Sequence, residues 1–416
     1  MKPAAPYLSV VATARNDNHG GDLLLRMQTF INGVAEQCAR HRLDAEVIVV
    51  EWNPPPDRPR LAEALTWPEN PWCAMRIIEV PPEVHARLEH SDRLPLFQMI
   101  AKNVGIRRAR GEFVLATNVD ILFPDELIEE LSRRELQYDR YYVVDRHDVA
   151  ITPDPSLPID ETLQLCSRNV VRICTRMGTR DLVTGRYYPI HAERELPLWV
   201  RRAIYFSRAA KRRIVLSWNY CVDAVGLRGK GAGESLVPSA SPSSSASQEP
   251  SLEATTRRSV RRVLADEARR AYIAWRAEAV RISLHTNACG DFTLLSRSGW
   301  ETTRAYPELE MFSMHIDGLF LVEAHYGGFA EAELPHRIFH IEHAQGFKPA
   351  PAAVKSLDER LRRAAIPQVT TDQFSRWLTE MSITGRPIAF NGDDWGFAAE
   401  SLPEVTPVLQ RTRAHA

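Results

Sequence analysis

Apolar and polar positions follow a regular alternation over the first 150 residues. Two stretches, 23–40 and 94–111, carry apolar residues at the three- and four-residue spacing of a helix. Around them lie short, almost continuous apolar runs, which are typical of strands buried on both faces. Strands that alternate with helices predict an α/β fold with a mainly parallel central sheet flanked by helices. The apolar runs are YLSVVATA (7–14), AEVIVVEW (45–52), AMRIIEVP (74–81) and EFVLAT (112–117).

Acidic residues stand where three of these predicted strands end. Asp17 follows the first strand, Glu51 lies near the end of the second, and Asp120 follows the fourth. Ligands bind parallel sheets outside the carboxyl ends of the strands, so the three side chains are expected to converge on one crevice. The alternative interpretation is the ordinary polarity of strand ends and turns.

Charge and cysteine content narrow the function classes. The 52 Lys and Arg nearly cancel the 53 Asp and Glu, so no overall basic field exists to hold a nucleic-acid backbone, and no nucleic-acid partner is predicted. The six cysteines are scattered and form no CxxC pair, which predicts a reducing compartment. The sequence shows neither a secretory signal pattern nor an 18-residue apolar stretch, so a cytoplasmic location is expected.

Residues 229–258 differ in composition from the rest of the chain. Ser, Pro, Gly and Ala dominate and large apolar residues are few, which predicts a disordered loop. Basic amphipathic stretches, expected to be helical, lie on either side at 196–218 and 257–285. Two interpretations stay open for them: solvated helix faces packed on the core, or a peripheral contact with anionic lipid or a charged acceptor.

Three segments resemble the donor half of family 2-like GT-A glycosyltransferases. The segments are VVATARND (10–17), VIVVEWN (47–53) and AKNVGIRRARGEFVLATNVDILFPDEL (101–127). The Asn-x-Gly helix and the Gly-Glu strand of that family are matched by Asn103, Gly105, Gly111 and Glu112. The Asp-x-Asp loop of the family is Asn118-Val119-Asp120 in this sequence, so Asp120 is its one remaining carboxylate.

The resemblance implies a nucleotide-sugar donor, a UDP-sugar, with a divalent cation, Mn²⁺ or Mg²⁺, on its diphosphate. Such a cation binds carboxylate and phosphate oxygens together, and Asp120 is expected to be its carboxylate ligand. The late segment 336–347 carries His340 and His343, where many GT-A enzymes have the histidine that completes the metal site; His343 is preferred. For Asp120 the alternative is a turn or capping residue, and for either histidine taken alone a core residue is the favoured interpretation.

The donor site implied by this resemblance contains residues from several strand ends. Glu51 stands where the family's second-strand acid contacts the uracil or the ribose, and Arg15 and Asn16 are expected to address the base and the phosphates. Asp291 is placed in the donor-sugar or acceptor pocket, with a packing or hydrogen-bonding role as the alternative. The expected donor-binding residues are Thr13, Arg15, Asn16, Asp17, Glu51, Asn103, Asn118, Asp120 and Asp291.

The segment 285–329 resembles the acceptor half of galactosyltransferase-like GT-A enzymes. Asp317 occupies the place of the acidic residue that acts there as general base on the acceptor hydroxyl. A single base on the acceptor side suffices for transfer with inversion, and the acceptor is expected to be a carbohydrate or another molecule with a hydroxyl group. The alternative for Asp317 is a helix-terminal aspartate stabilised by the helix dipole.

Two other functions compete with that of a glycosyltransferase, and the resemblance also predicts how the chain is divided into parts. A GT-A-like pseudoenzyme that acts as a binding or scaffold protein would explain the depleted acidic triplet. A sugar-nucleotide nucleotidyltransferase would need a glycine-rich, basic phosphate loop after the first strand, where only Gly20 and Gly21 stand. The predicted parts are a nucleotide-sugar-binding half (1–150), a mostly helical insertion (151–282), an acceptor half (283–350) and a C-terminal helical extension (351–416).

Overall fold

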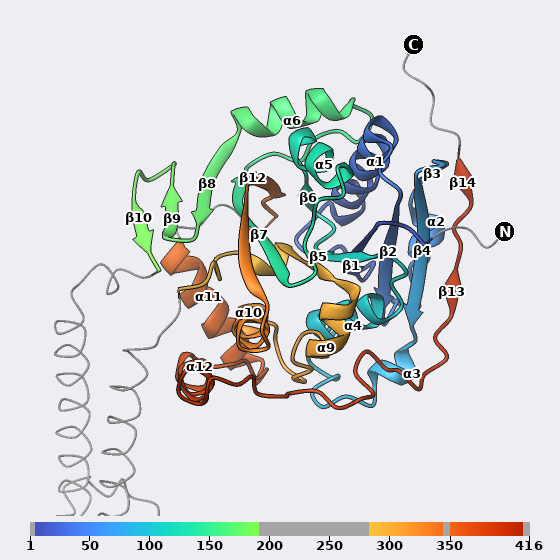
Figure 1. Ribbon diagram of the computed structural model, residues 1–416. Helices are drawn as coiled ribbons and strands as arrows, with labels where there is room; N and C mark the ends of the chain where they lie inside the picture. Colours follow the sequence, from blue (N-terminus) through green and yellow to red (C-terminus); the bar gives the residue numbers. More distant parts are fainter. Residues whose placement is uncertain (1–4, 191–282, 344–349, 411–416) are drawn as a thin grey trace, which may run out of the picture. The chain divides into compact units, whose positions relative to one another are not determined.

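A computed structural model describes residues 5–190, 283–343 and 350–410, which belong to one compact unit formed by 1–191 and 282–416 (Figure 1). The predicted loop 229–258 and the basic stretch 196–218 lie outside the described residues, as does all but the end of 257–285. No helix within the described ranges is long and apolar enough to cross a membrane.

The centre of the sheet is parallel, as the apolar runs predict. Four strands are adjacent in the order β5-β1-β2-β4, and each neighbouring pair is parallel. Their positions confirm the four predicted strands to within one residue at the start and the end of each. The bounds are β1 (Leu8–Ala14), β2 (Ala45–Trp52), β4 (Cys73–Val80) and β5 (Phe113–Thr117).

Helices cover both faces of this centre, because alternate residues of each buried strand point to opposite sides. Val10 of β1 packs in a cluster with residues of α1 and α5, and Val11 packs in a second cluster with residues of α4, α9 and α10 (Figure 1). The mixed α/β class with helices on both sides is thus confirmed. The helix bounds are α1 (Leu23–His41), α4 (Gln98–Arg107), α5 (Asp125–Ser132), α9 (Arg297–Thr303) and α10 (Ile316–Tyr326).

The other half of the sheet is built from strands far apart in the sequence. β11 (Phe292–Ser296) lies between β5 and β7 (Arg140–Val149) and is antiparallel to both. β12 (Ala330–Ile341) runs parallel to β7 and antiparallel to β6 (Ile121–Leu122), which directly follows Asp120. The segment after residue 283 therefore completes the sheet next to the carboxyl end of β5.

The remaining elements extend the sheet and close its edges. Antiparallel strands β8, β9 and β10 continue from β7, and residues 151–190 thus hold one helix and three strands. β13 pairs with β4, and β14 with β3, so the C-terminal region contributes short strands as well as α11 and α12. The bounds are α2 (Leu61–Ala64), β3 (Trp67–Pro68), α3 (Pro82–His85), α6 (Ile159–Arg168), β8 (Val170–Thr175), β9 (Gly178–Asp181), β10 (Tyr187–Pro189), α11 (Ala350–Arg363), α12 (Thr371–Thr384), β13 (Glu404–Val405) and β14 (Leu409–Gln410).

Close packing of α4 on the sheet gives a stability prediction. A Cβ on Gly105 would lie 2.5 Å from Cγ1 of Val11 and 3.0 Å from Cγ2 of Val50. Gly105→Ala is expected to lower the free energy of unfolding by about 1–3 kcal/mol in urea titrations, because the core must move apart. Gly318→Ala is the matched control: its nearest neighbour is at 3.5 Å, and helix propensity favours alanine by up to about 1 kcal/mol. Equal effects of the two substitutions would contradict the close approach of α4.

Candidate active site

The carboxyl end of β5 carries a buried carboxylate, Asp120, which is 5% exposed. Its Oδ2 lies 2.7 Å from Nη1 of Arg26, 3.1 Å from Nε2 of His343 and 4.0 Å from Nε2 of His340. Burial alone would raise the pKa of Asp120, but the hydrogen bond from His343 and the charges of His340 and Arg26 outweigh burial and hold the pKa well below its usual range. Asp120 is therefore an anion held among cationic groups.

His340 is oriented by a second buried carboxylate. Its Nδ1 lies 3.0 Å from Oδ1 of Asp148, which is fully buried and paired with Arg146 and Arg172 at 2.8 Å each. A proton on Nδ1, donated to Asp148, leaves Nε2 facing Asp120. This carboxylate–imidazole arrangement is the usual support of a metal-ligating histidine.

Two effects act in opposite directions on the pKa of His340. One is the burial of its ring, and the other is the presence of two neighbouring carboxylates. Burial favours the neutral ring, but the hydrogen bond to Asp148 and the charge of Asp120 outweigh burial and raise the pKa of His340 to about 9. A metal ligand must be the neutral imidazole, with a proton on one ring nitrogen only. A cation bound here would therefore take the place of the proton on Nε2, while Nδ1 keeps its proton for Asp148.

The donor atoms around Asp120 fit a divalent cation. One ligand atom from each of Asp120, His340 and His343 lies within 4.8 Å of the others. Among the described residues, Oδ1 of Asp120 is buried without a hydrogen-bond partner, although Oδ2 is occupied. The 4.0 Å between Nε2 of His340 and Oδ2 of Asp120 is too long for a hydrogen bond, so Nε2 of His340 is not bonded to this carboxylate. One carboxylate and two imidazoles suit a Mn²⁺-like ion better than Mg²⁺, which prefers oxygen.

Asn118 and Asp291 link this cluster to the neighbouring strands. The side-chain amide of Asn118 donates to Asp291 and accepts from Gln98. Arg146 donates to the other carboxylate oxygen of Asp291 and also pairs with Asp148. Asn118 thus positions Asp291.

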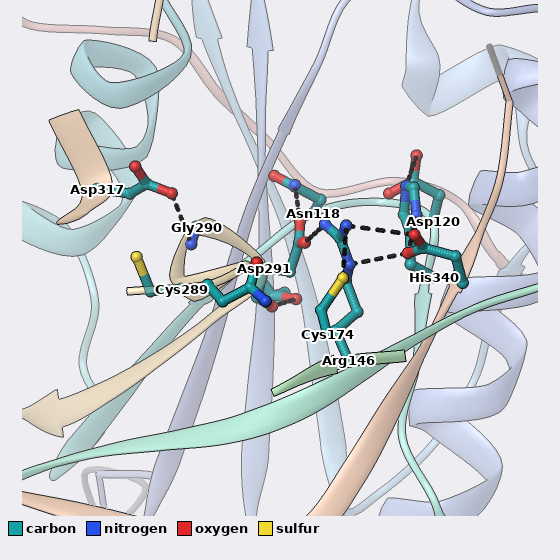
Figure 2. A network of polar contacts seen from close by, with 12 residues as sticks. Asn118, Asp120, Arg146, Cys174, Cys289, Gly290, Asp291, Asp317 and His340 are labelled. Atoms are coloured by element: carbon teal, nitrogen blue, oxygen red, sulfur yellow. Dashed lines mark hydrogen bonds and ion pairs between the residues drawn. The ribbon is translucent and has the colours of Figure 1, made fainter. Parts of the chain in front are cut away.

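Asp317 lies on the far side of a short turn, the 3₁₀ helix η2 (Cys289–Asp291). Figure 2 shows Asp317 beside Gly290, Asp291 in the middle, and Asp120 with His340 opposite. Oδ2 of Asp317 accepts from the backbone N–H of Gly290 at 2.9 Å, and a Cβ at position 290 would lie 2.7 Å from that oxygen. A side chain at position 290 would therefore displace the carboxylate of Asp317 from the turn.

Lys102 holds the same turn through a hydrogen bond to its backbone. Its Nζ donates to the carbonyl oxygen of Gly290 at 2.6 Å, and the side chain is fully buried. Burial lowers the pKa of Lys102 to about 8 against the opposing charges of Asp291, Asp317 and Asp120. The charge of Lys102 therefore interacts with all three of these carboxylates.

The other predicted donor-binding residues are held by the protein itself. Thr13 donates to the carbonyl of Val50, Arg15 to the carbonyl of Asn53 and to Asp17, and Asn16 to the carbonyl of Pro59. These contacts join the loops that follow β1 and β2. Because β1, β2 and β5 are parallel, these side chains lie at the same edge of the sheet as Asp120, and their part in binding a donor stays a prediction.

Glu51 and Asn103 differ in their surroundings. Both carboxylate oxygens of Glu51 accept from the backbone N–H of Leu61, and burial raises the pKa of Glu51 to about 7. Asn103, in the middle of α4, bonds to the backbone of Tyr306 and to Glu308. The structure therefore gives Asn103 a packing contact between α4 and the loop after α9, and its place in a donor site stays a prediction.

Four charged residues of this network were not predicted from the sequence. Arg26 stands on the apolar face of α1, and Lys102 among the buried residues of α4, and a lone charge at such a position is the signal that could have identified them. Arg146 and Asp148 lie in the run DRHD at the end of an apolar strand. Four polar residues in a buried strand require partners, and this signal was also available.

Comparisons with known proteins leave the family open. No protein-family model matches the chain, and no curated protein matches it in sequence. The crystal structure of S. aureus TarS 1-349 is similar at a TM-score of 0.37 and 11% identity, covering 91% of this chain and 71% of that chain. TarS 1-349 in complex with UDP-GlcNAc gives a TM-score of 0.35 and 11% identity, over 91% and 72%. Similarity this low carries no inference about function.

The raised pKa of Glu51 predicts a pH dependence of stability. Because the folded-state pKa of about 7 exceeds the ordinary 4.5, Glu51 stabilises the fold below pH 4.5, and this contribution is lost as the pH rises through 7. Glu51→Gln cannot ionise, so between pH 5 and 8 the wild type should lose about 1–3 kcal/mol more unfolding free energy than the variant. Urea titrations at several pH values measure this difference, with the exposed Glu63→Gln as control. Parallel curves for wild type and Glu51→Gln would refute the assignment.

Proposed function

We propose that this chain is a metal-dependent glycosyltransferase that moves a sugar from a nucleotide diphosphate donor, a UDP-sugar, to a hydroxyl group of an acceptor, with inversion. The observation that carries the proposal is the cluster at the carboxyl end of β5. There Asp120, His340 and His343 face one another, and Asp148 holds His340 in the orientation of a ligand. This is the edge of a parallel sheet at which nucleotide ligands bind.

Asp120, His340 and His343 would hold the cation. A bound Mn²⁺ or Mg²⁺ supplies Lewis-acid stabilisation of the departing diphosphate. Arg26, which reaches Oδ2 of Asp120 at 2.7 Å, keeps that carboxylate ionised and fixed. Thr13, Arg15, Asn16, Asp17 and Glu51, at the ends of β1 and β2, would bind the nucleotide.

Asp317 would act as the general base for the acceptor hydroxyl. It stands in the first turn of α10, half-buried, and accepts backbone hydrogen bonds from Gly290 and Gly318. These donors fix the orientation of the carboxylate toward η2. Because Gly290 is next to Asp291, the base and the Asp291–Asn118 side of the cluster are joined through one short turn.

One observation favours a second function, a GT-A-like binding or scaffold protein without catalysis. The guanidinium of Arg26 already pairs with Asp120, and Asn118 replaces a carboxylate, so the site carries less negative charge than a pair of acids would. A cation would then have Oδ1 of Asp120 as its free carboxylate oxygen. Metal binding separates the two functions.

Metal dependence is the first consequence of the proposal. Release of nucleotide diphosphate across a panel of donors is expected to require Mn²⁺ or Mg²⁺ and to stop with EDTA. Asp120→Asn should abolish Mn²⁺ binding in calorimetry, and Asp148→Asn should weaken it about 10–100-fold, because His340 loses its oriented tautomer. Asp372→Asn, on the exposed start of α12, serves as control. Turnover that is indifferent to metal would overturn the metal assignment.

The role of Asp317 gives a second test. Asp317→Asn is expected to lower the rate of transfer by about 10²–10⁴-fold, since the acceptor proton loses its base. Binding of the UDP-sugar with Mn²⁺, measured by calorimetry, should stay within about threefold of wild type, because Asp317 lies across η2 from Asp120. Loss of transfer and donor binding together, with a lowered unfolding temperature, would make Asp317 a structural residue.

A further inference from the structure

The hairpin of β9 and β10 forms the free end of the large sheet. β10 pairs with β9 and is the last strand in the sheet order (Figure 1). One face of the hairpin is fixed on the rest of the sheet, because Thr179 packs against Cys174 and bonds to Asn287. The other face and the tip remain to be explained.

Large apolar side chains gather on this hairpin and face solvent. Of the eleven large hydrophobic side chains that are exposed among the described residues, five lie within residues 177–190. At the tip, Val183 is 62% exposed and Leu182 is 45% exposed. Exposed apolar groups concentrated in so short a segment mark a surface of interaction. The five residues are Met177, Leu182, Val183, Tyr187 and Ile190.

The charges on the hairpin are positive. Arg180 and Arg186 are exposed, and neither forms an ion pair with any residue in the described part of the chain. The one acid within 177–190, Asp181, is fully buried, and its carboxylate accepts from the backbone N–H groups of Val183 and Thr184. The exposed surface of the hairpin is thus apolar and cationic, without a compensating anion of its own.

The edge strand is poorly suited to pair with a second copy of the chain. β10 has three residues, and the last of them, Pro189, has no backbone N–H to donate. Short edges and proline are the features by which sheets avoid pairing edge to edge. A flat anionic surface needs no backbone pairing, and it matches both the apolar tip and the two arginines.

We propose that the hairpin 177–190 docks the protein on an anionic lipid bilayer, with Leu182 and Val183 inserted at the level of the headgroups. Arg180 and Arg186 then lie against lipid phosphates, and Tyr187 occupies the interfacial position that tyrosine favours. A membrane contact was one of the two interpretations of the basic stretches 196–218 and 257–285, and this proposal assigns such a contact to a described segment. The docking surface is independent of the proposed transfer reaction.

Vesicle co-sedimentation of the full chain tests the proposal. At about 0.1 M salt, the wild type is expected to bind vesicles of phosphatidylcholine with about 30% phosphatidylserine at least fivefold better than pure phosphatidylcholine, since the arginines attract anionic headgroups. Leu182→Ser with Val183→Ser should reduce the fraction bound to anionic vesicles at least fivefold. Arg180→Glu with Arg186→Glu should abolish the preference for anionic vesicles.

Val408→Ser is the matched control, since this residue lies outside the hairpin and is 82% exposed. Its binding to vesicles should equal that of the wild type. Undiminished vesicle binding of the Leu182/Val183 variant would assign the contact to another part of the chain and overturn the proposal. A wild type that sediments equally with both vesicle types, or a dimer in light scattering that the same variant converts to a monomer, would also overturn it.

Discussion

The buried carboxylate of Asp120 is the charge on which the arrangement of the site depends. An ionised carboxylate at this depth is strongly unfavourable unless it is paired and hydrogen-bonded. Its partners come from separate parts of the chain: Arg26 from α1, His340 from β12, and His343 from the segment that follows β12. Removing one partner of such a buried pair costs about 3–5 kcal/mol, so the network holds α1 and β12 against the end of β5.

The turn η2 connects this network to Asp317 on the other side of the site. Gly290 donates to Asp317 and accepts from Lys102, while the next residue, Asp291, is fixed by Asn118 and Arg146. A shift of this turn would therefore move both carboxylates. The proposed role of Asp317 as a base would depend on this fixed placement, because positioned catalysis requires reacting groups to be held in place.

How much the sequence predicts depends on how local the physical cause is. The parallel strands β1, β2, β4 and β5 were predictable because burial on both faces leaves a continuous apolar run in each strand. Asp120 was predicted as a strand-end residue, and His340 and His343 from the resemblance of 336–347 to the metal-binding segment of GT-A enzymes; the structure places these side chains near one another, and their role as metal ligands stays a prediction. The insertion of β11 between β5 and β7 was not, because it brings residue 292 beside residue 117 and no local pattern records such a pairing. A lone charge on an apolar helix face shows that Arg26 and Lys102 need a partner, but their partners, Asp120 and the carbonyl of Gly290, are distant in the sequence and could not be identified from it.

The polar end of β7 shows why a buried strand can carry so many charges. Successive residues point to opposite faces, so Arg146 and Asp148 join the cluster of Asp120, while Asp145 bonds to His285 on the other face. Farther out, Arg172 of β8 is neutralised by Asp148, and Arg176, just after β8, by Glu331 and Glu333. From β9 onward the arginines are no longer paired with acidic residues: Arg180 and Arg186 have no ion-pair partner among the described residues. The proposed docking surface rests on this combination of cations without an ion-pair partner in the described part of the chain and exposed apolar side chains beside them.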